Sequence, residues 1–297
     1  MDQVIIVKAP AKINLGLTVL GRRPDGFHEI ESVMQQVSLS DTILLEPSPL
    51  KGWSFFCTDP DLSGDSNLVC RAAEMLEHRA GASLAAVKIT LFKNIPVEAG
   101  LAGGSSDAAA ALFGLNRYWQ LELSKTELSE LGAKLGSDVP FCLQGGTAMA
   151  RGRGEILEYL TPIPFFWVIL AVPAGVKIST AAAYSSFDSG LPGEPSLAPL
   201  VEAIQLGSRN KIAGWLAGGF SNILETADLP GSDLLVSLKN RLRARGFQPA
   251  LSGSGPALFM LTEKYSMARS AACAVEEEGG KAYLCWTVAG NEEWSNV

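Results

Sequence analysis

The sequence predicts an α+β protein of two domains, which we place at residues 1–160 and 161–297. A chain of 297 residues is longer than one domain of ordinary size. Its composition, 47% hydrophobic and 19% charged, is typical of a globular protein with ample material for a core. Strand and helix signals also form two series, because the pattern starts afresh after about residue 160.

Strand signals dominate the first third of the chain. Short β-prone runs, separated by Pro, Gly and Asp, predict strands at 4–8, 14–20, 33–39, 42–46, 53–58 and 87–92. Apolar residues at helical spacing predict a helix over 67–79, which ends before Gly81.

Two further helices are predicted in the first domain. One follows a loop at 96–104 and begins within 105–107, because serine followed by aspartate is a helix-start signal. It continues to Trp119 through a run of alanines, which have the highest helix propensity. The other begins at Ser124, which forms a capping box with Glu127, and ends at Gly136.

The second series of elements begins with a buried strand at 167–172. The patterns after it predict helices at 180–187, 200–206, 210–217, 233–244 and 267–278, and strands at 257–262 and 281–286. A loop at 252–256 leads into the first of these two strands.

Charge and composition exclude several classes of protein. A net charge of −7 argues against a nucleic-acid binder, although Lys8, Lys12, Arg22 and Arg23 form a local basic cluster for an anionic ligand. Five scattered cysteines without a C-x-x-C pair indicate reduced, mostly buried thiols, and two histidines away from any cysteine pair argue against zinc. No metal-ligating set of residues is predicted.

The chain has no signal for export or for a membrane. Its first residues lack a basic segment, and the longest apolar run, 165–172, is far shorter than a membrane span. We therefore expect a soluble, cytoplasmic protein that binds neither membrane nor nucleic acid.

A glycine-rich loop between a predicted strand and a predicted helix is the most informative segment. Its glycines let backbone N–H groups approach an anion, and the helix that follows directs its positive end to the same place. The loop has neither Walker nor dinucleotide-binding spacing, and a flexible turn that caps a helix remains an alternative. Asp107, just beyond it, would repel a phosphate unless it faces away. The loop consists of Pro96, Val97, Glu98, Ala99, Gly100, Leu101, Ala102, Gly103, Gly104, Ser105 and Ser106.

Three motifs together resemble those of the GHMP kinases: residues 10–15 (PAKINL), the loop at 96–106, and residues 251–256 (LSGSGP). Two more, 23–28 (RPDGFH) and 136–141 (GSDVPF), make the chain more similar to one family of that group, the 4-diphosphocytidyl-2-C-methyl-D-erythritol kinases. The resemblance runs from about residue 4 to about residue 286.

The resemblance implies a fold and a reaction. The fold is the two-domain GHMP kinase fold, with a ribosomal-protein-like N-terminal domain, a ferredoxin-like C-terminal domain and the active site in the cleft between them. The reaction transfers the γ-phosphoryl group of ATP, with Mg²⁺, to the 2-hydroxyl of a cytidine diphosphate alcohol in the non-mevalonate isoprenoid pathway. The partner is this small molecule, and the protein is expected to be a monomer or a weak homodimer.

The resemblance also implies the catalytic residues. Asp138 matches the general base, although an aspartate before Val-Pro is also typical of a helix N-cap. Lys12 matches the cation that keeps this aspartate ionised and offsets charge on the transferred group. A solvated strand lysine is the alternative. Asn14 shares the strand face of Lys12 and is expected at the substrate hydroxyl.

Further matched residues are expected to bind the substrate or the nucleotide. Phe27, where the family often has tyrosine, keeps a stacking face without the phenol hydroxyl. For Tyr184, a core aromatic on an amphipathic helix is the alternative, and for residues 252–255 it is a tight turn. Asn222 and Glu225 also match the family, but the sequence gives them no role. The predicted substrate residues are Asn14, Phe27, His28, Thr180, Tyr184, Ser252, Gly253, Ser254 and Gly255, and Asn67 is expected near the adenine.

Two other functions compete with this interpretation. Another GHMP kinase, of the homoserine or mevalonate type, would share the ATP loop but lack the 23–28 segment and the aromatic pair of Phe27 and Tyr184, which the resemblance places on either side of the cytosine. A non-catalytic nucleotide sensor on the same scaffold would have lost Lys12 or Asp138, and both are present. A serine hydrolase is excluded, because G-x-S-x-G is absent.

Overall fold

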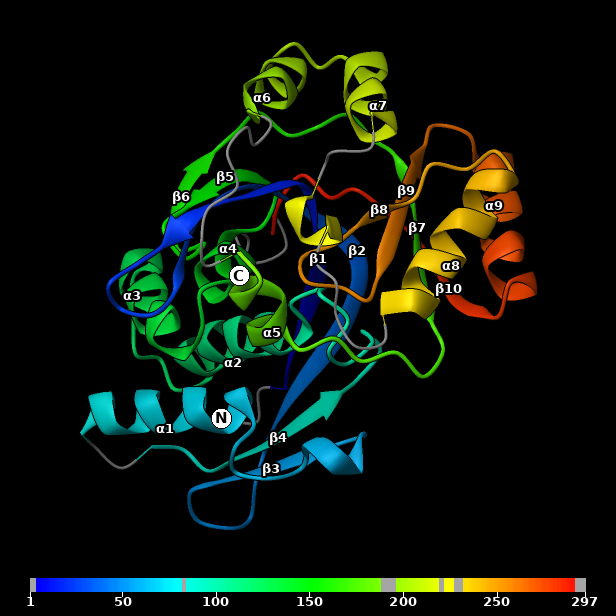
Figure 1. The fold of residues 1–297 in the computed structure, drawn as a ribbon. Coiled ribbons are helices and arrows are strands. Elements are labelled where there is room, and N and C mark those ends of the chain that lie inside the picture. The colour runs from blue at the N-terminus through cyan, green and yellow to red at the C-terminus, as the bar shows by residue number, and fades with distance from the viewer. Residues whose placement is uncertain (1–3, 82–83, 188–195, 219–221, 227–231, 292–297) are drawn as a thin grey trace.

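The computed structural model describes residues 4–81, 84–187, 196–218, 222–226 and 232–291. In these residues the chain forms the predicted α+β fold, with two separate β-sheets and helices packed on both (Figure 1). The first sheet takes its strands from residues 5–159 and the second from residues 167–286. The division at residue 160 into domains stays a prediction, since the strands of the first sheet also pack against the second half of the chain.

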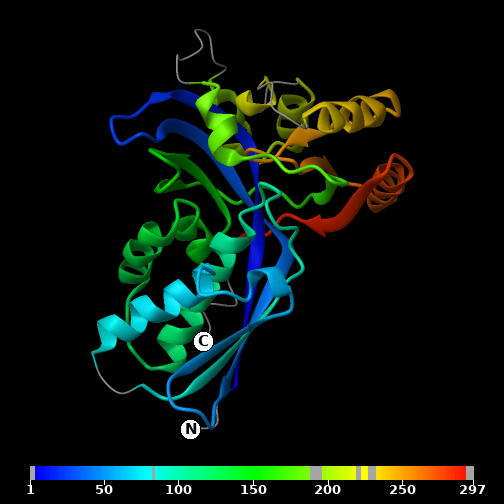
Figure 2. The same ribbon diagram turned by 60° about the horizontal axis from the view of Figure 1, so that its bottom comes forward.

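The first sheet is built around two long antiparallel strands, β1 and β2 (Figure 2). One end of β2 pairs with β4 and the other with β5, which gives the order β3-β4-β2-β5-β6 with β1 alongside β2. The strands are β1 (Ile5–Arg22), β2 (His28–Pro47), β3 (Trp53–Cys57), β4 (Val87–Phe92), β5 (Thr147–Arg151) and β6 (Ile156–Tyr159).

Strict alternation along β1 explains why this segment is a strand. Its odd-numbered residues from Ile5 to Val19 are apolar and buried, whereas the even positions carry polar residues such as Lys8, Lys12 and Asn14. Side chains alternate between the two faces of a strand, so this pattern directs one face into the core. The other face is free to present Lys12 and Asn14 to a site.

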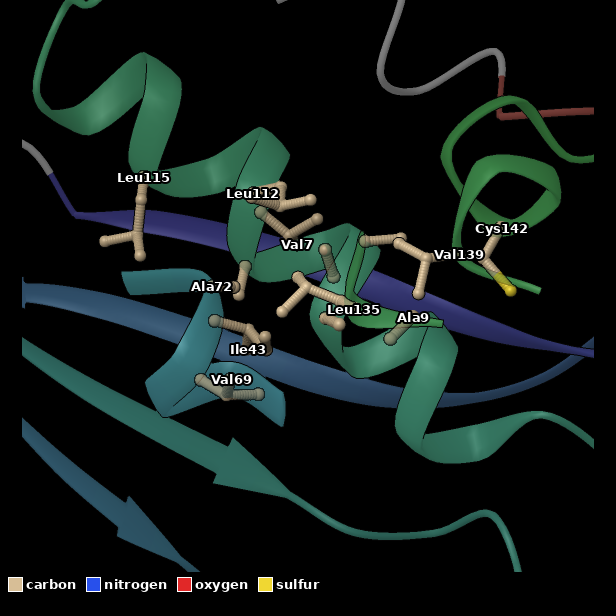
Figure 3. Close-up of a cluster of buried hydrophobic side chains, with 14 of the residues drawn as sticks. Val7, Ala9, Ile43, Val69, Ala72, Leu112, Leu115, Leu135, Val139 and Cys142 are labelled. Atoms are coloured by element: carbon tan, nitrogen blue, oxygen red, sulfur yellow. The ribbon is translucent and has the colours of Figure 1, made fainter. Parts of the chain in front are cut away.

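The helices of the first half cover one face of the first sheet. Leu112 and Leu115 of α2 pack in one cluster with Val7 of β1 and with Val69 and Ala72 of α1 (Figure 3). Small alanines along the centre of α2 let it lie close to the sheet. These helices are α1 (Leu68–Ala80), α2 (Gly103–Tyr118), α3 (Lys125–Leu135) and α4 (Val139–Gln144).

The second sheet has the order β10-β7-β9-β8, and helices α8 and α9 cover one of its faces (Figure 1). Its other face packs against residues 11–15 of β1 and against α6 and α7. The elements are β7 (Trp167–Pro173), α5 (Thr180–Ser185), α6 (Ala198–Gln205), α7 (Arg209–Ala217), α8 (Ser232–Ala244), β8 (Ala250–Leu251), β9 (Leu258–Thr262), α9 (Tyr265–Glu277) and β10 (Gly280–Trp286).

The structure corrects the predicted strand lengths. The runs at 4–8 and 14–20 belong to one strand, and so do those at 33–39 and 42–46. Pro10 does not end β1, because the register of β1 against β2 shifts between Pro10 and Lys12 and again between Asn14 and Gly16. Such irregularities tolerate proline and re-aim side chains, often beside active sites. Strands β5, β6 and β8 were not predicted, and the start of helix α4 was expected only in the helix-cap alternative for Asp138.

Of two expectations drawn from composition, the buried thiols are confirmed and the cytoplasmic location is not tested. All five cysteines are free thiols, and all except Cys273 are buried, as predicted. Within the described residues, no helix combines the length and the apolar character needed to cross a membrane. The cytoplasmic location stays a prediction.

Candidate active site

A cleft of about 1030 Å³ lies where β1, the glycine-rich loop, helix α5 and the loop before β9 meet. Its size suits a nucleotide together with a second small molecule. Every predicted ATP residue except Ser106 lines this cleft, and so does every predicted substrate residue except Ser252 and Gly255.

Lys12, Asn14 and Asp138 form a polar cluster within the cleft. Lys12 Nζ donates to Asn14 Oδ1 at 2.8 Å and lies 3.6 Å from Asp138 Oδ2. The side chain of Lys12 is only 6% exposed, so the solvated-strand alternative is wrong. Asn14 Nδ2 in turn donates to Ser32 Oγ at 2.7 Å, which fixes the amide. A buried cation and a carboxylate that is 29% exposed thus face each other.

Asp138 occupies the N-cap position of α4, but its side chain makes no capping hydrogen bond. Pro140, within the first turn of α4, has no N–H to cap. The helix-cap alternative therefore describes the backbone position of Asp138 and leaves its carboxylate available to the cleft.

The glycine-rich loop is held in place by backbone hydrogen bonds to β1 and to the loop before β9. Lys12 N donates to Leu101 O at 3.1 Å, and Ala257 N donates to Ala99 O at 3.1 Å. Gly100 has φ +75°, and a Cβ on it would lie 2.3 Å from Ser252 O, so only glycine fits there. The loop is therefore rigidly docked, which contradicts the flexible-turn alternative.

Helix α2 begins at Gly103, two residues before the predicted start. Its N-cap is Ala102, in a left-handed conformation and without a capping side chain. The first N–H groups of a helix have no intrahelical partners, and here they belong to Gly103, Gly104 and Ser105, which line the cleft. Together with the helix dipole, they favour an anion such as a phosphate group at this position.

Ser106 does not belong to this phosphate site. Its side chain is fully buried and donates to Pro10 O at 2.7 Å, while its backbone N–H donates to Ala102 O. Because α2 starts earlier than predicted, Ser106 lies on the face of the helix that packs against β1. Ser105 lines the cleft and remains the available hydroxyl.

Asp107 is part of a buried charge cluster with Lys93 and Asp41. Lys93 Nζ lies 2.5 Å from Asp41 Oδ2 and 2.7 Å from Asp107 Oδ2. Asp107 Oδ1 is buried without a hydrogen-bond partner. The Lys93 ammonium offsets the charge of Asp107, which limits the repulsion of a phosphate that the sequence led us to expect. Burial raises the pKa of the Asp107 carboxyl to about 8, and the neighbouring Asp41 adds to this.

This shift predicts a pH-dependent stability. Between the ordinary carboxyl pKa and pH 8, folded Asp107 holds a proton that the unfolded chain has released, so the free energy of unfolding falls as pH rises and levels above pH 8. Denaturant unfolding from pH 5.5 to 9 should show a fall on the order of 1 kcal/mol per pH unit below pH 8. Asp107→Asn should flatten the slope, whereas Asn at the exposed Asp65 should not. Equal slopes in all three proteins would contradict the assignment.

One end of the cleft carries aromatic rings. The His28 and Tyr184 ring centroids are 5.7 Å apart, with the rings inclined by 31°. Tyr184 also packs against the core under α5, as its alternative interpretation predicts, and its contact with a substrate stays a prediction. Phe27 is 52% exposed, and the Arg153 guanidinium lies 4.7 Å from its ring centroid. This end of the cleft therefore presents aromatic faces, on which a planar ring can stack, and the guanidinium of Arg153.

The loop after β8 contributes to the cleft in two ways. Gly253 and Ser254 line it, and Ser254 Oγ is 2.8 Å from the hydroxyl of Thr180. Ser252, fully buried, donates from its hydroxyl to Gly100 O at 3.0 Å. Ser252 therefore supports the glycine-rich loop from behind, and the predicted contact with a substrate does not fit its position.

Asn67 lines the cleft but already uses both ends of its amide. Its Oδ1 accepts from Val69 N at 2.9 Å as the N-cap of α1, and its Nδ2 donates to Leu62 O at 2.9 Å. Its contact with an adenine stays a prediction.

Three cations of the cleft were not assigned to the site from sequence: Arg22, Lys93 and Arg153. Arg22 and Lys12 are the two members of the predicted basic cluster that line the cleft. Arg23 is instead paired with Asp25 and Glu29. Arg153 follows β5, which the sequence did not reveal. The alternation of Arg and Gly at 151–154 was the available signal.

Comparison with known proteins supports the family resemblance found in the sequence. Residues 67–146 match the family of GHMP kinases N terminal domains. The 4-diphosphocytidyl-2-C-methyl-D-erythritol kinase of Bacillus pumilus (strain SAFR-032) is 44% identical over 263 residues, which cover 87% of this chain and 88% of that protein. The enzyme of the same name from Pelotomaculum thermopropionicum (strain DSM 13744 / JCM 10971 / SI) is 46% identical, with coverage of 91% and 93%.

A solved structure extends the similarity to three dimensions. The crystal structure of a 4-(cytidine 5'-diphospho)-2C-methyl-D-erythritol kinase is 34% identical and has a TM-score of 0.75, covering 95% of this chain and 99% of that one. Both the sequence and the fold are thus shared over almost the whole length. The chain belongs to the 4-diphosphocytidyl-2-C-methyl-D-erythritol kinase family of the GHMP kinases.

Proposed function

We propose that this protein transfers the γ-phosphoryl group of ATP to the 2-hydroxyl of 4-diphosphocytidyl-2-C-methyl-D-erythritol, a step toward isoprenoid precursors by the non-mevalonate route. One observation carries the proposal: the anion-binding start of α2, the Lys12–Asp138 pair and the His28–Tyr184 ring pair share one cleft. These are the parts that a phosphoryl donor, a reacting hydroxyl and a nucleobase each require.

The phosphates of ATP are assigned to the glycine-rich loop and the start of α2. The N–H groups of Gly103 and Gly104 fit a phosphate chain, and the close packing of Gly100 on Ser252 O holds the loop in place beside it. Mg²⁺ fits as an ion carried on those phosphates, with the Ser105 hydroxyl as the available side-chain oxygen. When bound, it would neutralise charge on the β- and γ-phosphates.

The acceptor alcohol is assigned to the space beside Asp138, Lys12 and Asn14. In the reaction, the alcohol oxygen forms a bond to the γ-phosphorus while the bond from that phosphorus to the oxygen leaving with ADP breaks. The proton of the hydroxyl passes to Asp138, or is held by it in orientation. Lys12 offsets charge on the transferred group, and Asn14 fixes the lysine through its 2.8 Å hydrogen bond.

The cytosine and the diphosphate of the substrate are assigned to the aromatic end. His28 offers ring nitrogens to the base, Tyr184 offers a stacking face, and Arg22 and Arg153 face the anionic diphosphate. A homoserine or mevalonate kinase would need neither a base-stacking pair nor these arginines. We further propose that the protein acts in the cytoplasm as a monomer or a weak homodimer.

An assay with competing alcohols tests the proposal. Purified protein, ATP and Mg²⁺ are incubated with the cytidyl substrate, homoserine or mevalonate, and ADP release and the phosphorus spectrum of the product are followed. Turnover of the cytidyl substrate alone is the expected result. Turnover of another alcohol would overturn the substrate assignment, and ATP binding without any ADP release would favour a nucleotide sensor.

Arg153 allows a more specific prediction. Arg153→Gln should raise KM for the cytidyl substrate about 10-fold or more, because an arginine–phosphate contact is charge-assisted, while KM for ATP stays within twofold. Steady-state kinetics with each substrate varied in turn measures both constants. Arg151→Gln, two residues earlier and paired with Glu31 and Glu158, is the matched control. Equal changes in both KM values would remove Arg153 from the substrate site.

A further inference from the structure

Asn222 and Glu225, which match the family but have no predicted role, lie near β1 and outside the cleft lining. Asn222 is 3% exposed, and its backbone forms an isolated β-bridge with Leu17 of β1. The residues after it form a short 3-10 helix, Ile223–Thr226. Asn222 is buried and Glu225 is largely buried, so their polar atoms need partners within the protein, and their hydrogen bonds identify these partners.

Both residues bind the backbone at the end of β8. Asn222 Nδ2 donates to Leu251 O at 3.1 Å and to Gly253 O at 2.8 Å, while Asn222 Oδ1 accepts from Leu224 N at 3.0 Å. Glu225 Oε1 accepts from Leu251 N at 2.7 Å. The backbone groups of Leu251 and the carbonyl of Gly253 are thus fixed by these two side chains.

Glu225 is itself fixed by an ion pair. Its Oε2 contacts Lys239 Nζ of α8, and both side chains are largely buried. A buried ion pair holds its partners in one geometry, because separating them leaves an uncompensated charge. Asn222 and Glu225 thus form a clamp on residues 251–253, and this clamp is anchored to α8.

Two further contacts connect the backbone of residues 251–253 to Lys12. Ser252 Oγ donates to Gly100 O at 3.0 Å, and Lys12 Nζ also points to Gly100 O, at 3.4 Å. Gly253, with φ +55°, passes so close to the site that a Cβ on it would lie 3.4 Å from Lys12 Nζ and from Asn14 Oδ1. A shift of residues 251–253 would therefore displace both the glycine-rich loop and Lys12.

We propose that Asn222 and Glu225 are positioning residues for phosphoryl transfer: through residues 251–253 and Gly100 they hold Lys12 and the phosphate loop in register with Asp138. The proposal rests on the function proposed above. Catalysis by positioning is sensitive to displacements near 1 Å, so loosening this clamp lowers the rate of the chemical step in a folded enzyme.

The test is Asn222→Asp, which keeps the shape and the acceptor for Leu224 N but removes the donor to the two carbonyls. Its matched control is Asn116→Asp, because Asn116 Nδ2 also donates to a backbone carbonyl, Leu123 O at 3.1 Å, away from the cleft. We expect Asn222→Asp to lower kcat about 10- to 100-fold at temperatures where it is fully folded. Asn116→Asp should stay within twofold of the wild type.

Combination with Lys12→Met separates positioning from general stability. If part of the effect of Asn222 passes through Lys12, the loss of kcat in the double variant should be smaller than the product of the two single losses, since groups that act as a unit are not additive. Multiplied losses in the double variant would overturn the proposal. Glu225→Gln should also lower kcat, and Lys239→Met in the same chain should restore part of it by removing the stranded charge.

Hydrogen exchange gives a readout that does not depend on the substrate. Amides in peptides covering 99–103 and 251–257 should exchange faster in Asn222→Asp than in the wild type or in Asn116→Asp. Unchanged exchange together with kcat within twofold of the wild type would overturn the proposal. If the wild type phosphorylates a different alcohol, the proposed function fails. The role of Asn222 is then decided by the same kcat comparison on that alcohol and by the exchange data.

Discussion

Asp138→Asn should lower kcat by about 10³-fold while leaving the dissociation constant for ATP within a few-fold of the wild type. Asparagine has the shape of aspartate but cannot accept the proton of the hydroxyl as a carboxylate does. The substitution removes no capping hydrogen bond from α4, but it leaves the buried Lys12 ammonium without its carboxylate partner, so a lower free energy of unfolding is expected. Single-turnover kinetics with the cytidyl substrate, together with ATP titration, measures both quantities.

Asp233→Asn is the control for this change, since Asp233 is an exposed aspartate in the first turn of α8. Its kcat should equal that of the wild type. If Asp138→Asn retains kcat within tenfold, Asp138 orients the hydroxyl at most, and transfer proceeds without a carboxylate base. Such a result would fit a dissociative transition state, in which the hydroxyl keeps its proton until late.

Lys12→Met should lower kcat by about 10²- to 10³-fold, with a smaller effect on KM for either substrate. Methionine preserves most of the side-chain volume but removes the cation that faces Asp138 at 3.6 Å. It also removes the donor to Asn14 Oδ1, so the loss combines charge and positioning. The rate constant for phosphoryl transfer under single-turnover conditions is the measurement.

Lys8→Met is the matched control, because Lys8 lies on the same strand four residues earlier and donates to Thr42 at 3.0 Å outside the cleft. Its rate should match the wild type. A Lys12→Met enzyme with near wild-type kcat and a raised KM for ATP would show that Lys12 binds the ground state and does not act in the transition state.

Much of the site could be predicted from the sequence because its residues fall in short local patterns. Lys12 and Asn14 are two positions apart on one strand, so their shared face follows from strand geometry alone. Asp138 precedes a Pro-containing helix start, a pattern that fixes the backbone but not whether the carboxylate caps the helix. That question needed the structure, which shows no capping bond.

The rest could not be predicted because it depends on contacts between distant segments. Ser106 and Ser252 belong to the recognised motifs, yet each hydroxyl is buried against a backbone carbonyl from elsewhere, Pro10 O or Gly100 O. Arg153 enters the cleft from the end of β5, a strand without a strong pattern of its own. The lengths of β1 and β2 were underestimated, because a register shift absorbs Pro10.

The burial pattern of β1 has a consequence for how the protein folds. Its odd residues belong in turn to three clusters: Val7 packs under α2, Ile13 packs against elements after residue 160, and Leu17 packs beneath the second sheet. The second and third clusters therefore need contacts between residues separated by more than 150 positions, which slow folding and make it cooperative. A fragment that starts at residue 161 would expose the surface that β1 covers. We therefore expect the two halves of the chain to unfold together in one cooperative transition.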